Sequence, residues 1–293
     1  MKVLVAGASG FIGSELLAQL TLAGHEIATL TRGEDGPGRH HWDPATSYLA
    51  PAIIAWADTV VNLAGASLNQ LPWTPKRRDD ILTSRLLATN LIVDRILASS
   101  APPAALLNGS AVGIYGHRPG ETLADDAPAA GDSFLREVVE QWEAAAHRAD
   151  DTTRVVTLRT GVVVGRGGAF TPLELLTKVG LAGRLGPGTQ HWPWIALHDE
   201  AAAIVHLLTS TLSGAVNLEG PTPATAQHIT DALAERMHRP HLFAVPSVAL
   251  GLLLGQAARE LLLSDQKAVP TRLLADGFEF RYPTIEDAIA ATF

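Results

Sequence analysis

The 293-residue sequence contains no cysteine. Disulfide bonds, thiolate catalysis and cysteine-ligated metal sites are therefore excluded. Long apolar runs are also lacking, because the longest, VALGLLLG at 248–255, is too short to span a bilayer. Positive charge is scarce: 22 Lys and Arg residues stand against 30 Asp and Glu residues, which gives a formal net charge of −8. This balance argues against a nucleic-acid partner and against a polybasic membrane contact.

The first ten residues, MKVLVAGASG, carry one lysine and a short apolar run, unlike a secretory signal peptide. We therefore expect a cytoplasmic protein that acts on a small molecule, with no nucleic-acid partner and no membrane partner. The sequence does not indicate an oligomeric state. Apolar residues make up 47% of the chain and charged residues 18%, so we expect a sizeable folded core.

Apolar, β-branched segments alternate with segments of helical spacing along the first 165 residues. The segments that predict strands are 2–7, 25–32, 58–65, 104–112 and 154–165, with a later one at 214–220. The segments that predict helices are 11–23, a long helix starting at Pro75 with Thr74 as its N-cap, and 134–149. This alternation indicates an α/β fold with a parallel sheet.

Three glycines recur at every third position between the first predicted strand and the first predicted helix. In that context the first allows a tight turn, the second lets the backbone approach a pyrophosphate, and the third lets the helix pack on the strand. Free N–H groups at the helix start then bind the anion. The spacing is G-x-x-G-x-x-G, so a purely structural turn stays an alternative. The residues predicted to contact a cofactor here are Gly7, Ser9, Gly10, Phe11, Ile12 and Gly13.

The end of the second predicted strand indicates which dinucleotide binds. Thr31 and Arg32 stand where NAD-binding sheets carry an acid that bonds the ribose. Arg32 can instead pair with a 2′-phosphate, and a charge-assisted bond of about 1.5–3 kcal/mol corresponds to a roughly 10- to 100-fold preference. We therefore predict NADP(H) as the cofactor. The alternative is that Arg32 is only solvated and Glu34 bonds the ribose.

Many segments, in order, resemble one family. They are GASGFIG, TR, VNLAGASL, WTPKRRDDILTSR, NGSAVGIYG, WEAAA, LRTGVVVGRGGAF, HWPWI and LLLSDQKAVPTRLLADGFEFRYPTIEDAI. The chain resembles the atypical extended short-chain dehydrogenases/reductases, in the group of nucleoside-diphosphate-sugar epimerase-like proteins. The final segment is similar to that group's short C-terminal domain of unknown function. The resemblance implies a doubly wound Rossmann sheet with a small, mostly helical C-terminal annex.

The resemblance also implies cofactor contacts beyond the glycine loop. Carried over by position, these residues are Thr31, Arg32, Asn62, Leu63, Ala64, Gly65, Asp80, Arg85 and Val162. An independent argument supports 62–65, because ligands of open α/β sheets lie at the carboxyl ends of the strands. The expected division is an NADP-binding domain at 1–220, with a cleft-lining insertion at about 166–198, and a small domain at 221–293 that completes the substrate cleft.

The Tyr-x-x-x-Lys dyad of ordinary short-chain reductases is missing. Four residues after Tyr48, Tyr115 and Tyr282 stand Ala52, Pro119 and Glu286. At the register where the dyad should fall stand Phe134, Leu135 and Val139. Side-chain proton transfer contributes typically about 10²- to 10⁴-fold to a rate, so another group would have to replace the dyad.

Ser110 and Tyr115 are the predicted catalytic residues, because they lie at the end of a central strand near the expected nicotinamide. Their alternatives are a hydrogen-bonded strand-end serine and a packed tyrosine. Trp192 and Trp194 are expected to wall the cleft, and no metal site is predicted. Two functions therefore stay open. The chain is an NADP(H)-dependent oxidoreductase or epimerase for an unknown small molecule, or a catalytically silent NADP(H)-binding sensor or regulator.

Overall fold

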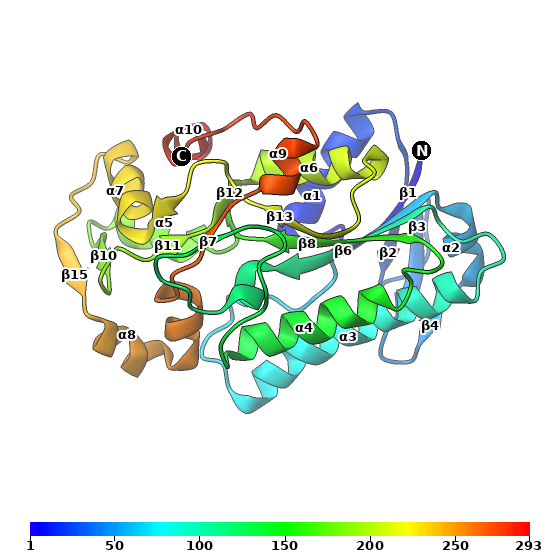
Figure 1. The fold of residues 1–293 in the computed structure, drawn as a ribbon, viewed down its shortest axis with the longest axis horizontal. Coiled ribbons are helices and arrows are strands. Elements are labelled where there is room, and N and C mark those ends of the chain that lie inside the picture. Colours follow the sequence, from blue (N-terminus) through cyan, green and yellow to red (C-terminus); the bar gives the residue numbers. More distant parts are fainter.

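A computed structural model describes residues 1–293 and centres on one eight-stranded sheet (Figure 1). Its strands, in spatial order, are β13 (Gly214–Leu218), β8 (Arg154–Thr160), β6 (Ala105–Ala111), β5 (Thr59–Asn62), β1 (Lys2–Ala6), β2 (Glu26–Thr31), β3 (Arg39–Asp43) and β4 (Tyr48–Leu49). All neighbours are parallel except β3 and β4. The strand order runs outward in both directions from β1 and β5. This arrangement confirms the predicted doubly wound sheet.

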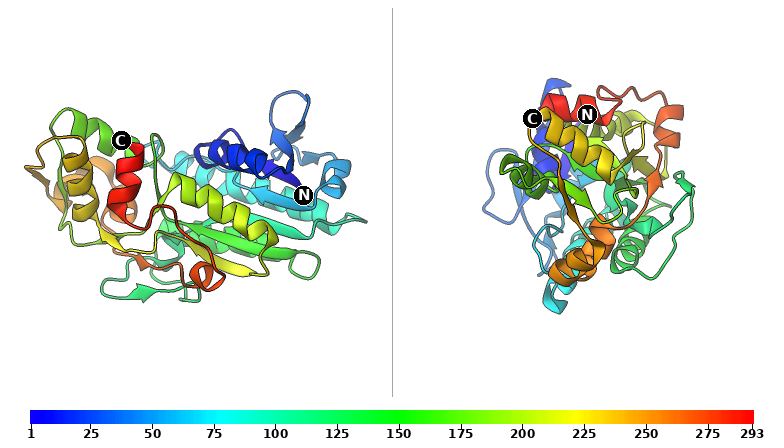
Figure 2. Two further views of the ribbon diagram at one scale, coloured as in Figure 1. Left: turned by 90° about the horizontal axis from the view of Figure 1, so that it is seen from above. Right: turned by 90° about the vertical axis from the view of Figure 1, so that its left-hand side faces the viewer.

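Helices cover both faces of the sheet. The helices on one face are α1 (Phe11–Leu22) and α6 (Leu197–Thr209), and those on the other are α2 (Pro51–Trp56), α3 (Pro75–Leu97) and α4 (Phe134–His147). Figure 2 shows α1 and α6 side by side. Val3 and Val5 pack toward α1 and α6, whereas Leu4 packs in the cluster of the opposite face. This alternation is the period of two that a strand imposes, and it explains why β1 is apolar throughout.

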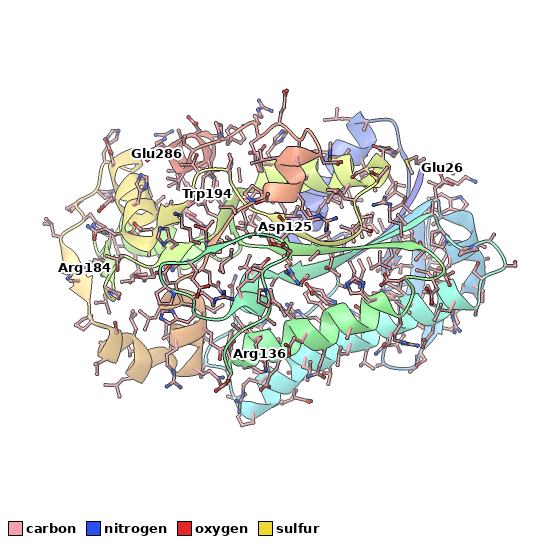
Figure 3. The ribbon with its side chains drawn as sticks, viewed as in Figure 1. Glu26, Asp125, Arg136, Arg184, Trp194 and Glu286 are labelled. Carbon is pink, nitrogen blue, oxygen red and sulfur yellow. The ribbon has the colours of Figure 1, made fainter.

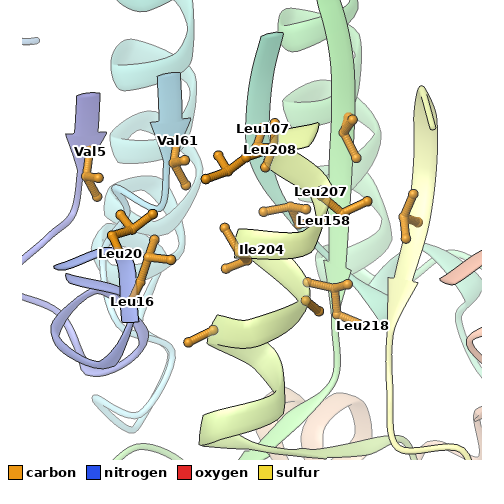
Figure 4. Close-up of a cluster of buried hydrophobic side chains, with 14 of the residues drawn as sticks. Val5, Leu16, Leu20, Val61, Leu107, Leu158, Ile204, Leu207, Leu208 and Leu218 are labelled. Carbon is orange, nitrogen blue, oxygen red and sulfur yellow. The ribbon is translucent and has the colours of Figure 1, made fainter. Parts of the chain in front are cut away.

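The core below α1 and α6 consists of interdigitating aliphatic side chains (Figure 4). Leu16 and Leu20 of α1 lie one turn apart and are fully buried against Val5 and Val61 of the sheet. The spacing of four residues places both leucines on the same helical face. This packing fixes the start of α1, and with it the glycine loop, against the carboxyl ends of β1 and β5.

The two long helices begin where their capping residues predict. The Thr74 hydroxyl accepts a hydrogen bond from the Arg77 N–H at 3.1 Å, and Pro75 occupies the first helical position. Ser133 caps α4 in the same way through the Arg136 N–H, also at 3.1 Å. These bonds satisfy backbone donors that a helix start leaves free.

The remaining elements form the annex and its links to the sheet. Its strand pairs are β9 (Val162–Val164) with β12 (Trp194–Ala196), β10 (Gly183–Leu185) with β15 (Phe243–Val245), β11 (His191–Trp192) with β14 (Ala224–Thr225), and β7 (Thr122–Leu123) with β16 (Lys267–Ala268). The remaining helical segments are η1 (Val112–Tyr115), which follows β6, and α5 (Phe170–Lys178), α7 (Ala226–Arg236), α8 (Ser247–Leu254), η2 (Ala258–Leu262), α9 (Thr271–Ala275) and α10 (Ile285–Thr292). The C-terminal region from residue 221 is mostly helical, as predicted.

A separate hydrophobic cluster holds the annex together. It joins side chains of the 164–196 segment, such as Phe170 and Trp194, with side chains of the last seventy residues, such as Leu233 and Ile289. The predicted insertion and the predicted C-terminal domain therefore share one core. The predicted boundary between domains at residue 220 stays a prediction. No helix combines the length and the apolar character that crossing a membrane would require.

Candidate functional site

A cavity of about 970 Å³ opens at the carboxyl ends of β1, β2 and β5. Eight of the residues predicted to contact the cofactor line it. They are Gly7, Ser9, Gly10, Thr31, Arg32, Leu63, Ala64 and Gly65. These residues come from three separate strand ends, and only the sheet brings them together. A crevice at this position is where open α/β sheets bind their ligands.

The glycine loop has the geometry that a phosphate cradle needs. Gly7 has a φ of +80°, and a Cβ atom there would lie 2.6 Å from the Leu63 carbonyl carbon. At Gly13, a Cβ atom would lie 2.3 Å from the Gly7 carbonyl oxygen. No side chain caps α1, and its first turn contains no acid. The first N–H groups of α1 are therefore free to bind an anion, which fits a dinucleotide pyrophosphate.

The far end of the cavity is basic. Arg32 is exposed, lines the cavity, and has no intramolecular ion pair. The Thr31 hydroxyl accepts a hydrogen bond from the Gly33 N–H at 3.1 Å. Glu34 lines a smaller adjoining hollow of about 430 Å³, shared with Arg32, and does not line the main cavity. This arrangement favours Arg32 over Glu34 as the residue nearest a bound ribose.

Asn62 shapes the cavity wall from behind. Its side chain is fully buried, and its Nδ2 donates to Asn108 Oδ1 at 2.7 Å and to Thr89 Oγ1 at 3.0 Å. Its Oδ1 accepts a hydrogen bond from the Ala64 N–H at 3.2 Å. Asn62 therefore fixes the turn that presents Leu63–Gly65 and does not itself line the cavity.

Arg85 lies directly behind Gly65. Its guanidinium donates to the carbonyl oxygens of Ala66 and Ile81 at 3.1 and 3.0 Å, and its centre lies 5.0 Å from the Trp142 ring. Burial, with the nearby charge of Arg77, lowers the pKa of Arg85 to about 10. Arg85 thus supports the cavity wall, in contact with the residues that line it.

Five other predicted cofactor residues, together with Asn62 and Arg85, lie outside the cavity lining. Asp80 pairs with Lys76 at 3.0 Å on the exposed side of α3. Phe11 lies against the glycines at 165–168, and Val162 lies in β9 opposite Trp194. Ile12 and Gly13 stand in the first turn of α1. For these residues the cofactor assignment stays a prediction.

Of the three basic residues at the start of α3, only Arg77 lines the cavity. Its Nη2 donates to the Ser67 carbonyl oxygen, and its Nε is buried without a partner. Arg78 donates instead to Gln256 Oε1 at 3.0 Å. The start of α3 therefore contributes one positive charge to the cavity.

Ser110 and Tyr115 belong to one hydrogen-bonded chain beside the sheet. The Ser110 hydroxyl donates to Glu143 Oε1 at 2.5 Å, and Arg159 donates to both oxygens of Glu143 at 2.9 Å. Arg159 Nη1 also donates to the Tyr115 hydroxyl oxygen at 3.0 Å. Glu143 and Arg159, whose roles the sequence did not indicate, thus link the two predicted catalytic residues.

Tyr115 is fully buried, and its hydroxyl donates to Asn217 Oδ1 at 2.6 Å. Burial raises the pKa of Tyr115 to about 12, against the opposing effect of Arg159. These contacts favour the packing alternative for Tyr115. Ser110 lies nearer the end of β6 and is 6% exposed, but neither residue lines the cavity. Their catalytic assignment stays a prediction.

The two tryptophans expected to wall the cleft are core residues instead. Trp192 and Trp194 are 4% and 1% exposed and belong to the hydrophobic cluster of the annex; Figure 3 labels Trp194. Their indole N–H groups donate to the carbonyl oxygens of Leu262 and Thr222. No group of three or more potential metal ligands occurs.

A pair of buried carboxyl groups lies beside the end of β8, and no sequence pattern predicted it. Glu200 Oε1 accepts a hydrogen bond from the Thr160 hydroxyl at 2.7 Å, and burial raises the pKa of Glu200 to about 8. Both oxygens of Glu219 lack a partner. Burial, together with the charges of Glu200 and Asp125, raises the pKa of Glu219 well above its usual value. A carboxyl in such surroundings stays protonated at neutral pH.

Comparisons with known proteins agree with this geometry. The model of the NAD dependent epimerase/dehydratase family matches residues 3–219, and a domain of unknown function matches residues 245–292. An epimerase family protein of Mycobacterium tuberculosis is 36% identical over 98% of this chain and 96% of its own length. The human epimerase family protein SDR39U1 is 34% identical over 99% of this chain and 98% of its own length.

Solved structures show the same relationship. The crystal structure of human SDR39U1 with NADPH has a TM-score of 0.91 at 33% identity and covers 99% of this chain and 98% of that one. Thermus thermophilus UDP-glucose 4-epimerase, at 19% identity and a TM-score of 0.75, shares the fold. The resemblance noted from the sequence is confirmed: this chain belongs to the NAD dependent epimerase/dehydratase family.

Proposed function

We propose that this chain binds NADP(H) in the cavity at the carboxyl ends of β1, β2 and β5, and uses it as an oxidoreductase or epimerase for a small molecule. One observation carries the proposal: free N–H groups of the glycine loop and the unpaired Arg32 line the same cavity. A related human protein, 33% identical, is solved with NADPH. The cytoplasm, where we expect the protein, supplies this cofactor.

Each part of the cavity suits one part of the dinucleotide. The start of α1 would bind the pyrophosphate through backbone N–H groups, and Arg32 would bind the 2′-phosphate. Leu63–Gly65 would contact the nucleotide from the β5 side. When bound, the nicotinamide supplies or accepts the hydride.

Ser110 is the proposed contact to the substrate. Its hydroxyl is oriented by Glu143, whose carboxylate is in turn fixed by Arg159. Because its proton is donated to Glu143, the Ser110 hydroxyl is held with its oxygen free to accept a hydrogen bond from a hydroxyl group of a substrate. Tyr115 has a high pKa and an enclosed hydroxyl, so it is poorly suited to give a proton at neutral pH.

A second function is favoured by the same observations on Tyr115 and by the missing dyad. The chain would then bind NADP(H) without turnover and act as a sensor or regulator. The two functions share the cavity and differ only in whether bound NADPH is consumed.

Titration of the purified protein with NADPH and NADH tests both functions, followed by turnover against aldehydes, ketones, quinones and enones. We expect NADPH to bind at least about tenfold more tightly than NADH, because one charge-assisted contact to the 2′-phosphate provides a preference of that size. Turnover that Ser110→Ala slows without changing NADPH affinity supports the enzyme. Tight binding without turnover on a broad panel supports the sensor. Equal affinity for both cofactors contradicts the role of Arg32.

A further inference from the structure

We propose that Arg39 is a second residue that binds the 2′-phosphate, opposite Arg32. This inference rests on the proposed binding of NADP(H). Arg39 begins β3, which runs parallel to β2 and places Arg39 beside Thr29. Arg32, just past the end of β2, and Arg39 both line the main cavity. Two arginines from neighbouring parts of the chain therefore line the same cavity.

A tight connection fixes the position of Arg39. The Gly36 N–H donates to the Arg39 carbonyl oxygen at 3.0 Å, and the Arg39 N–H donates to the Gly36 carbonyl oxygen at 2.9 Å. The Arg39 side chain folds back over Gly36, where a Cβ atom would lie 2.9 Å from Arg39 Nη2. The absence of a side chain at residue 36 thus leaves the space that the guanidinium occupies.

Neither guanidinium has an intramolecular carboxylate partner, although the chain carries a net charge of −8. Glu34, which shares the smaller hollow with Arg32, forms no ion pair with either arginine, and two other nearby acids accept hydrogen bonds from other groups. Asp35 Oδ1 accepts a hydrogen bond from the His41 N–H at 2.6 Å. Asp43 accepts hydrogen bonds from the Thr46 hydroxyl and the Ala45 N–H, which lower the pKa of its carboxyl. Two arginines without an ion-pair partner in the lining of one cavity provide a site for a dianion.

The ligand class follows from this charge and from the rest of the cavity. Arginine binds phosphate through planar, charge-assisted hydrogen bonds, and two arginines can share the oxygens of one phosphate. The ligand is therefore a nucleotide with a phosphate on its adenosine ribose. NADH lacks that phosphate, so neither arginine increases its binding affinity. A 3′-phosphate carries the same charge but is attached to the neighbouring ribose carbon. Comparing a 2′-phosphate nucleotide with its 3′-phosphate isomer therefore distinguishes the effect of charge from the effect of phosphate position.

Titration of NADPH and NADH into Arg39→Ala, Arg32→Ala and the double variant tests the inference. We expect Arg39→Ala to weaken NADPH binding by roughly 10- to 100-fold, the effect of one charge-assisted contact, and to leave NADH affinity unchanged. Arg39→Lys should recover part of the loss. Arg236→Ala, which removes an exposed arginine on α7 away from the cavity, is the matched control and should leave NADPH affinity unchanged.

Adenosine 2′,5′-bisphosphate and adenosine 3′,5′-bisphosphate serve as fragments in calorimetric titrations. Tighter binding of the 2′ isomer, lost in Arg39→Ala, supports the inference, and equal binding of both isomers contradicts it. An unchanged NADPH affinity in Arg39→Ala overturns the role of Arg39 alone. If the unaltered protein binds neither NADPH nor NADH, the proposed function itself is wrong.

Discussion

At the scale of single residues, the glycine loop is the part of the site that the sequence predicted best. Gly7 and Gly10 line the cavity, and Gly13 lies at the helix–strand contact. Local spacing was sufficient because the turn and the contact between loop and helix depend on backbone atoms a few residues away, although Gly7 also lies against the distant Leu63 carbonyl. Arg39 could not be predicted in this way, because its place beside β2 depends on strand pairing and not on spacing.

Gly13→Ala tests the close contact between loop and helix. The new methyl group would lie 2.3 Å from the Gly7 carbonyl oxygen and 2.8 Å from Ala8 Cα, both backbone atoms that cannot rotate away. We expect a loss of stability of about 1–3 kcal/mol, as for other overpacked sites, together with weaker NADPH binding. Urea denaturation and cofactor titration measure the two effects.

Gly251→Ala is the control for that substitution. Nothing lies within 4 Å of a Cβ atom at Gly251, in the middle of α8. Alanine is favoured over glycine inside a helix by up to about 1 kcal/mol. This variant should therefore be as stable as the unaltered protein or more so, with unchanged cofactor affinity. A stable Gly13→Ala with normal affinity would contradict the role of that contact.

At the scale of elements, alternating apolar segments predicted the inner strands and the long helices. β3 and β4 were not predicted, because RHHWD is largely polar and YL is only two residues long. Their places at the sheet edge come from pairing with β2 and with each other. The places of Trp192 and Trp194 also depend on distant contacts. Their sequence context suggested a cleft wall, but both side chains pack in the hydrophobic core of the annex.

The first residue of α4 contacts a residue 126 positions away. Glu260 of η2 accepts hydrogen bonds from the N–H groups of Phe134 at 3.0 Å and Leu135 at 2.8 Å. This carboxylate satisfies two free donors and interacts favourably with the helix dipole. We expect Glu260→Ala to lower the free energy of unfolding by about 1–3 kcal/mol, as measured by urea denaturation.

Glu260→Gln distinguishes charge from hydrogen bonding, since glutamine keeps one acceptor oxygen and loses the charge. We expect Glu260→Gln to lower the free energy of unfolding by less than Glu260→Ala does. Equal stability of Glu260→Ala and the unaltered protein would show that the contact between η2 and α4 contributes nothing to the fold.

At the scale of the whole molecule, the annex and the sheet meet over buried carboxyl groups. Glu219 follows β13, and Glu200 lies on α6. Asp125 lies near α9 (Figure 3), where its Oδ2 accepts a hydrogen bond from the Arg272 N–H at 3.1 Å. No local pattern predicts such a group, because three distant segments bring its members together. The protonation of this group should therefore influence the stability of the entire chain.

The direction of that influence follows from proton linkage. Glu200 has a pKa of about 8 in the folded chain, above its usual value of 4.5. Between these two values the folded chain binds one proton more than the unfolded chain, so stability is full below pH 4.5 and falls as the pH rises toward 8. Each pKa unit corresponds to about 1.4 kcal/mol, so this group alone accounts for a loss of a few kcal/mol.

Glu200→Gln removes this titration while keeping the shape of the side chain. We expect urea denaturation to give the unaltered protein less stability at pH 9 than at pH 6, and Glu200→Gln a smaller difference between the two. Glu279→Gln, at an exposed position, is the control and should retain the full pH dependence. If the pH dependence of Glu200→Gln equals that of the control, the glutamate is not protonated in the folded chain, and the buried group must be ionised and neutralised by another means.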